Sequence, residues 1–403
     1  MNRAADAGEV TRWLAEHARP LAVPDDEPAG EDGVDAWVRA ARGARVVALG
    51  PAVVGTRELP QLVTRLLDAL VADGGVHTLA LQASESGTTL LDDHVRDGTG
   101  SAGDTLEALG SWSWNTREVL DLVAGLAPGS GSLRVVGVEP RRPATAVRVV
   151  GRFLRTAAPD ALPPVADALA DLALGYGDDA ARAAVARVRE RLDVDDPALV
   201  AATSAARHAE AVRQAGYLAR AAELAATPPG AAGAVAGRLM AQAVVEALEA
   251  GGPDERLVLW AHADHVVVRD DTLGGHLRER LGDGYRALVL SAGAGGTQAL
   301  RRRSVFGPTR TPRRQRFAAP PAGSLEAALL AASPRDAVLD LRAARAPATP
   351  AAVTAWAGAP ATRRSVGDEV SPRSPVGAVV PCVPGTELDG FAVVRTVHPG
   401  WVR

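Results

Sequence analysis

The sequence contains no lysine, so all 44 of its basic residues are arginine. This absence excludes a P-loop lysine, a pyridoxal Schiff base and any lysine that acts as a base or nucleophile. Cys382 is the only cysteine, which excludes internal disulfides, thiolate zinc clusters and CxxC redox chemistry. We expect Cys382 to pack as a small apolar side chain.

Long uncharged stretches are also missing. A membrane-spanning helix needs about 20 apolar residues in a row, and charged residues interrupt every stretch of that length. The first 20 residues mix acids and arginines with apolar residues, unlike a secretory signal. The sequence therefore predicts no membrane partner and a cytoplasmic location.

The composition is that of a globular protein, with 47% hydrophobic and 23% charged residues among 403. The net charge of -4 argues against a general polyanion binder. One stretch, residues 301–316 (RRRSVFGPTRTPRRQR), is strongly basic and broken by proline. We interpret it as an exposed loop at the rim of a site rather than a nucleic-acid patch, and we predict no nucleic-acid partner.

Short apolar runs alternate with longer helical stretches, which is the pattern of parallel strands joined by helical crossovers. We predict an α/β fold with a mostly parallel central sheet flanked by helices, in a single domain over residues 1–403. The predicted strands are residues 45–49, 78–81, 133–138, 257–260, 287–290, 337–341 and 391–395.

An alanine-rich helical region lies between the third and fourth of these strands. It covers residues 144–250 and is broken near Pro159, Pro197 and Pro228. This is more helix than one crossover needs, so we predict an inserted helical cap or subdomain. A set of surface helices packed around the sheet is the alternative.

Ligands of open α/β sheets bind beyond the carboxyl ends of the strands. Glu139 follows the third predicted strand, and His262 and His265 flank Asp264 after the fourth. Two histidines three residues apart can act as acid and base, hold a substrate oxygen, ligate a metal, or serve as a structural pair. A metal needs a further ligand, and we predict none.

Two further segments supply candidates near helix starts. Arg57 and Glu58 follow a glycine and open a helix, where a carboxylate is favoured by the helix dipole. Trp114 precedes a helix that Asn115 or Thr116 can cap, and it either stacks on a ligand or anchors the core. The GxSxG, GxGxxG and HExxH signals are absent.

Seven segments in order resemble the erythromycin esterase family. They are LGPAVVGTREL, LALQASESG, SWSWNTREVLDLV, VVGVEP, LVLWAHADHVVV, LRERLGDGYRALVL and FAVVRTVHP, and together they span nearly all of the chain beyond residue 40. The resemblance implies an esterase fold in which a histidine, helped by glutamates and two later histidines, activates water to attack a macrolactone carbonyl.

Members of that family read Gly-Glu-x-x-His-Gly after the first strand, a glutamate at the end of the second, and His-Asn-x-His after the fourth. Gly50, Gly55, Glu58, His262 and His265 match this pattern. The sequence departs from it at Pro51, Val54, Gln82 and Ala263, which stand for the first glutamate, the first histidine, the second glutamate and the asparagine. Valine accepts no proton and glutamine carries no charge, so the usual mechanism is in doubt.

These departures leave open whether the chain is an enzyme. One hypothesis is a divergent, hydrolase-like protein of specialised metabolism that acts on or binds a natural product or modified peptide. There are two alternatives. One is a noncatalytic descendant that binds a small molecule or partner, and the other is a weak macrolide lactone hydrolase with Glu85 or Ser84 as a replacement base. The predicted catalytic residues are His262, His265 and Glu58, and the predicted substrate contacts are Arg57, Gln82, Trp114, Glu139 and Asp264, with no cofactor.

Overall fold

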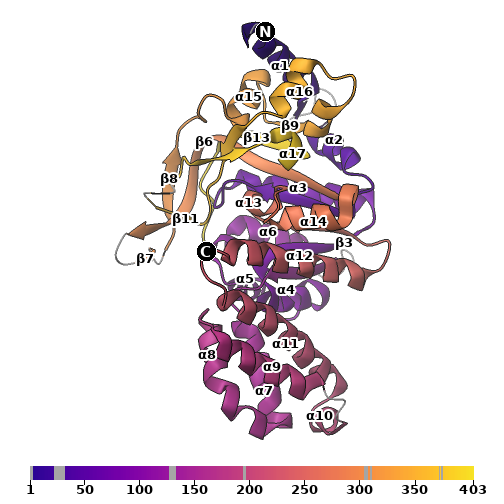
Figure 1. Ribbon diagram of the computed structural model, residues 1–403, viewed down its shortest axis with the longest axis vertical. Coiled ribbons are helices and arrows are strands. Elements are labelled where there is room, and N and C mark those ends of the chain that lie inside the picture. The colour runs from indigo at the N-terminus through magenta and orange to yellow at the C-terminus, as the bar shows by residue number, and fades with distance from the viewer. Residues whose placement is uncertain are drawn as a thin grey trace. The chain divides into compact units, whose positions relative to one another are not determined.

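The computed structural model describes residues 3–21, 32–126, 133–193, 197–303, 307–308, 311–371, 373 and 375–403 (Figure 1). The chain forms two compact units. Unit 1 comprises Met1–Leu79, Asn115–Gly125 and Leu248–Arg403, and unit 2 comprises Ala80–Trp114 and Leu126–Ala247. The prediction of an inserted subdomain over residues 144–250 stays a prediction.

Unit 1 is built on a sheet with the strand order β1-β9-β13-β6-β2-β5-β3. Strand β2 runs parallel to both β5 and β6, and β13 runs parallel to β6. The pairings of β9 with β1 and with β13 are antiparallel. The bounds are β1 Arg19–Pro20, β2 Val46–Pro51, β3 Val76–Ser84, β5 Arg256–Trp260, β6 Tyr285–Arg303, β9 Ala337–Asp340 and β13 Gly390–Val397.

The parallel strands coincide with the short apolar runs that the sequence predicts to be strands. All six residues of β2 are buried, as expected for a strand covered on both faces. Each of the seven predicted strands is present, with β4 (Arg134–Glu139) as the third. The mostly parallel α/β fold is thus confirmed.

Helices of unit 1 flank this sheet (Figure 1). Helix α3 shows why they do so, because it buries six apolar residues at helical spacing, from Leu59 to Leu70. The helices are α1 Arg3–His17, α2 Gly33–Ala40, α3 Glu58–Asp73, α6 Arg117–Gly125, α13 Ala263–Val266, α14 Leu273–Leu281, α15 Leu325–Ala332, α16 Ala351–Ala357 and α17 Pro384–Glu387.

The interpretation of residues 301–316 as a loop was wrong for much of its length. Strand β6 continues to Arg303 and pairs with the antiparallel strands β7 (Gly307–Pro308) and β8 (Arg313–Phe317). The reason is a partial alternation: Arg314 and Arg316 are exposed, while Phe317 is buried beneath the Arg364 guanidinium. Strand pairing therefore provides hydrogen-bond partners for the backbone N–H and C=O groups of a segment whose arginine side chains remain in solvent.

Three short strands complete the sheet structure of unit 1. Strand β11 (Glu369–Val370) runs parallel to the end of β6. Strands β10 (Ala361–Arg364) and β12 (Val379–Cys382) form a separate antiparallel pair. Cys382 in β12 is buried, and burial raises the pKa of its thiol to about 12, so this cysteine is a packed side chain.

Unit 2 carries the end of β3, strand β4 and a helical core. Helices α7, α8, α9, α10 and α11 bury an apolar cluster around Val150, Leu154 and Leu218, and the breaks at Pro159, Pro197 and Pro228 fall at helix ends. The helices are α4 Glu85–Asp97, α5 Ala102–Ala108, α7 Ala144–Ala157, α8 Ala166–Ala173, α9 Asp179–Asp193, α10 Pro197–Ala202 and α11 Ala205–Ala225. Helix α12 (Ala232–Gly251) follows.

No helix among the described residues combines the length and the apolar character that crossing a membrane requires.

Gly50 permits a close approach between β2 and α13. A methyl group on Gly50 would lie 2.3 Å from Val266 Cγ2 and 3.1 Å from Ala263 Cα. We expect Gly50→Ala to lower the free energy of unfolding by about 1–3 kcal/mol, because overpacking displaces a side chain or the helix. Urea unfolding measures this loss.

Gly8→Ala is the matched control, since nothing lies within 4 Å of its added methyl and Gly8 is in helix α1. Alanine should stabilise that helix slightly. Equal stability of the Gly50→Ala variant and the wild type would show that α13 does not pack tightly on β2.

Candidate functional site

His262 stands just beyond the carboxyl end of β5 and caps the short helix α13. Its Nδ1 accepts the backbone N–H of Asp264 at 3.2 Å. A neutral imidazole with an acceptor at Nδ1 carries its proton on Nε2. The ring of His262 is therefore oriented by its own helix and is a donor at Nε2.

His262 is held in the neutral state. Its side chain is 14% exposed, and burial lowers the pKa below the usual 6.5. The nearby charge of Asp264 and a hydrogen bond with the Val366 backbone oppose this shift, whereas His265 and Arg363 add to it. At pH 7 the ring is thus uncharged, as a proton acceptor or a neutral hydrogen-bond donor must be.

Asp264, in the first turn of α13, is the centre of a polar network. Arg363 Nη2 donates to Oδ1 at 2.6 Å, and Ser365 Oγ donates to Oδ2 at 2.6 Å. Burial alone would raise the pKa of Asp264, but the charges of His262 and Arg363 and these hydrogen bonds lower it to about 2. Asp264 is therefore ionised, and its carboxylate is 3.7 Å from His262 Nδ1.

The loop after β2 lies against the segment that follows Arg363. Val366 N donates to the Ala52 carbonyl at 2.8 Å, and Val54 N donates to the Val366 carbonyl at 2.9 Å. Pro51 is buried and Val54 is half-buried. The loop thus presents two apolar side chains on a backbone that hydrogen bonds hold in place.

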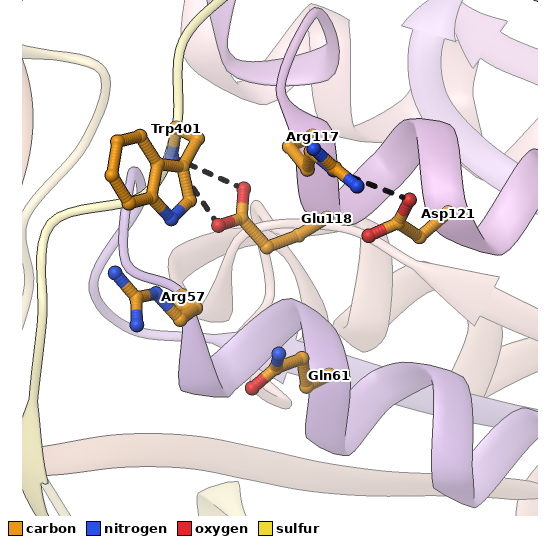
Figure 2. A pocket seen from close by; sticks show the side chains of 6 residues that line it. All are labelled: Arg57, Gln61, Arg117, Glu118, Asp121 and Trp401. Carbon is orange, nitrogen blue, oxygen red and sulfur yellow. Dashed lines mark hydrogen bonds and ion pairs between the residues drawn. The ribbon is translucent and has the colours of Figure 1, made fainter.

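Glu58 and Arg57 have partners that the sequence did not indicate. The Glu58 carboxylate accepts the backbone N–H of His398 and pairs with its Nδ1, both at 2.8 Å. The Arg57 guanidinium lies over the indole of Trp401, 5.4 Å from the ring centroid. Arg57 and Trp401 line a pocket together with Gln61 and three residues of α6 (Figure 2).

Unit 2 holds the other three predicted contacts. Gln82 lies in β3, and its backbone carbonyl accepts the indole N–H of the buried Trp114 at 3.2 Å. Glu139 ends β4 and is paired with Arg141 at 3.4 Å. The structure thus joins Gln82 to Trp114, which acts as a buried anchor.

Glu85 is a perturbed carboxyl group of unit 2. It begins α4 directly after β3, is 3% exposed, and accepts Arg220 Nε at Oε1 over 2.8 Å. Its Oε2 is buried without a hydrogen-bond partner among the described residues. Burial raises its pKa to about 7 against the opposing charge of Arg220, and the charges of Glu246 and Glu139 add to the rise.

No group of three or more histidine, cysteine, aspartate or glutamate residues is placed to hold a metal ion in the part of the chain that the structure describes. The prediction of a site without a cofactor stays a prediction.

These observations define an α/β protein with a mostly parallel sheet and polar clusters at the carboxyl ends of its strands. The chain belongs to the erythromycin esterase family, whose profile matches residues 71–397. The match begins within α3, after the loop that holds Pro51 and Val54. No curated protein sequence matches the chain at a significant level.

Solved structures share the fold. A Bacillus cereus protein superposes with a TM-score of 0.77 at 18% identity, covering 98% of this chain and 99% of that one. A succinoglycan biosynthesis protein gives 0.76 at 15% identity, covering 100% and 99%. A mutant of the erythromycin esterase EreC in its open conformation gives 0.68 at 16% identity, covering 97% and 98%.

Sequence reasoning missed Arg363, Ser365 and Trp401. The first two belong to a segment with little periodicity, and they reach Asp264 from about a hundred positions along the chain. Trp401 follows the last strand and carries no motif. The structure places the adjacent pair Arg363 and Arg364 in a strand and buries both side chains, which the sequence does not indicate.

Replacing Asp264 by asparagine removes the carboxylate that faces the buried Arg363. We expect a loss of roughly 1 kcal/mol in unfolding free energy at pH 7, reduced by the partial exposure of Asp264. Because the folded pKa is depressed, this stabilisation is present above about pH 4 and is lost as the pH falls towards 2. Urea unfolding between pH 7 and 3 measures it.

Asp270→Asn is the control, since Asp270 is exposed in the turn after α13. A loss for Asp264→Asn that is the same at pH 7 and pH 3 would contradict the assigned pKa.

Glu85→Gln tests the buried carboxyl group. A raised folded pKa means that Glu85 favours the fold most below about pH 4.5 and loses that contribution as the pH rises through about 7. Relative to Glu85→Gln, the wild type should therefore lose about 1–3 kcal/mol of unfolding free energy between pH 5 and pH 8. Glu107→Gln, at an exposed site of the same unit, should show no such change. A constant difference between wild type and Glu85→Gln would refute the raised pKa.

Proposed function

We propose that this chain is a divergent member of its family that acts on or binds a natural product or modified peptide through a carbonyl group. The observation that carries the proposal is the state of His262, which is neutral and fixed by Asp264 at the end of β5. Asp264 is in turn bound by Arg363 and Ser365, so the orientation of His262 is fixed through a charged network.

The geometry supports different roles for the two histidines. His262 Nδ1 accepts a backbone N–H and the ring also bonds to the Val366 backbone, so we assign to His262 the role of an oriented donor that a substrate carbonyl oxygen would share. His265 lies in the same helix, and we assign proton transfer to it. Asp264 is a positioning residue, since its carboxylate is held by Arg363 and Ser365 and fixes the turn that presents His262.

Gln82 and Glu139 are proposed substrate contacts, and Trp114 is proposed to hold the backbone at Gln82 through its indole N–H. Glu58 is proposed to act through His398, because its carboxylate is already bound to that residue. Location in a cytoplasmic biosynthetic setting is part of the same proposal.

A weak lactone hydrolase is the second candidate, and Glu85 is the observation that favours it. A carboxyl group with a pKa near 7 and one buried oxygen without a partner among the described residues has the properties of a general base. If Glu85 is the base, hydrolysis should rise with pH through about 7 and should be lost in Glu85→Gln.

His262→Ala combined with His265→Ala tests the first proposal. A panel of macrolide lactones and ester-containing peptides is incubated with each protein, binding is followed by thermal shift, and products are identified by mass spectrometry. We expect the double variant to lose ligand-induced stabilisation and any hydrolysis, with rate losses of about 10²-fold or more.

His276→Ala is the matched control, because His276 is a half-buried histidine of the same unit in α14. It should retain wild-type binding. Unchanged binding or turnover in a correctly folded double variant would refute the assignment of the site to His262 and His265. Binding without product in the wild type would identify a noncatalytic descendant.

A further inference from the structure

The pocket around Arg57 is formed by three separate parts of unit 1. Arg57 and Gln61 come from the start of α3, Arg117, Glu118 and Asp121 from the start of α6, and Trp401 from the C-terminal segment, around a volume of about 420 Å³ (Figure 2). A cavity of this size accommodates a small organic molecule.

Backbone hydrogen bonds hold the C-terminal wall of the pocket in place. Gly400 N donates to the Gly55 carbonyl at 2.9 Å, and Arg117 N donates to the Trp401 carbonyl at 2.8 Å. Residues 398–401 are therefore fastened to the loop before α3 and to the start of α6. Trp401 is nevertheless 55% exposed, so part of its indole is open to a ligand.

The charged side chains that line the pocket differ in the partners that they have within the protein. Arg117 pairs with Asp121 at 3.7 Å, and Glu118 accepts the Trp401 backbone N–H at both oxygens, over 3.2 and 3.3 Å. Arg57 has its contact with the indole, but its Nε is buried without a hydrogen-bond acceptor among the described residues. An unmade bond to a buried donor is costly, and a ligand that supplies the acceptor removes that cost.

We propose that this pocket is a second binding site, for a small monoanionic carboxylate with a flat apolar body. The carboxylate pairs with Arg57, for which planar bidentate acceptors are the best match. The apolar body packs on the exposed part of Trp401. The carboxylate of Glu118 faces the same space and opposes a second negative charge, so a dianion such as phosphate is disfavoured.

Benzoate is a suitable probe, with benzamide as its uncharged counterpart and inorganic phosphate as the dianion. Calorimetric titration of the full chain should show saturable benzoate binding, weaker benzamide binding and none for phosphate. Arg57→Gln and Trp401→Leu should each weaken benzoate binding about tenfold or more. Arg96→Gln, an exposed arginine of α4, should bind as the wild type does.

Retained secondary structure and melting temperature establish that each variant is folded. No benzoate binding to the wild type, equal binding to Arg57→Gln, or preference for phosphate would overturn the proposal. The site does not depend on the proposed role of His262, so the His262→Ala variant should bind benzoate normally. Loss of benzoate binding in His262→Ala with retention in Arg57→Gln would place the carboxylate elsewhere and refute the Arg57 site.

Discussion

The guanidinium of Arg363 is fully buried, and this constrains the end of β5, because its counter-charge Asp264 is in the first turn of α13. A buried cation is stable only when it is paired and hydrogen-bonded. The network of Asp264 with Arg363 and Ser365 therefore fixes α13, and α13 in turn fixes His262 through the Asp264 backbone N–H. The orientation of the candidate site follows from the need to neutralise one charge.

The same segment also closes the loop after β2. Val366 exchanges backbone hydrogen bonds with Ala52 and Val54, and these bonds hold the loop. Backbone pairing does not require particular side chains. The conformation of this loop therefore does not by itself indicate a reaction, which depends on the side chains.

Much of the fold could be predicted because burial imposes a simple pattern on parallel strands. The run of apolar residues in β2 is stable only in the interior of the protein, where all six residues are buried. Each predicted strand is present. The ribbon of β6 and β8 could not be predicted in this way, since its pairing is set by backbone geometry while arginines occupy the solvent face. Position after a strand indicated His262, Asp264 and Glu139, but Arg363 and Ser365, which bind Asp264, come from a distant segment that carries no motif.

Long-range pairing also decides what each charged residue can do. Arg57 and Glu58 are neighbours at a helix start. In the structure Glu58 pairs with His398, whereas Arg57 lies over the ring of Trp401. Glu58 is thereby satisfied within the protein, while the Nε of Arg57 has no acceptor among the described residues. Two adjacent residues therefore have different partners, because the C-terminal segment supplies a counter-ion to one and an aromatic ring to the other.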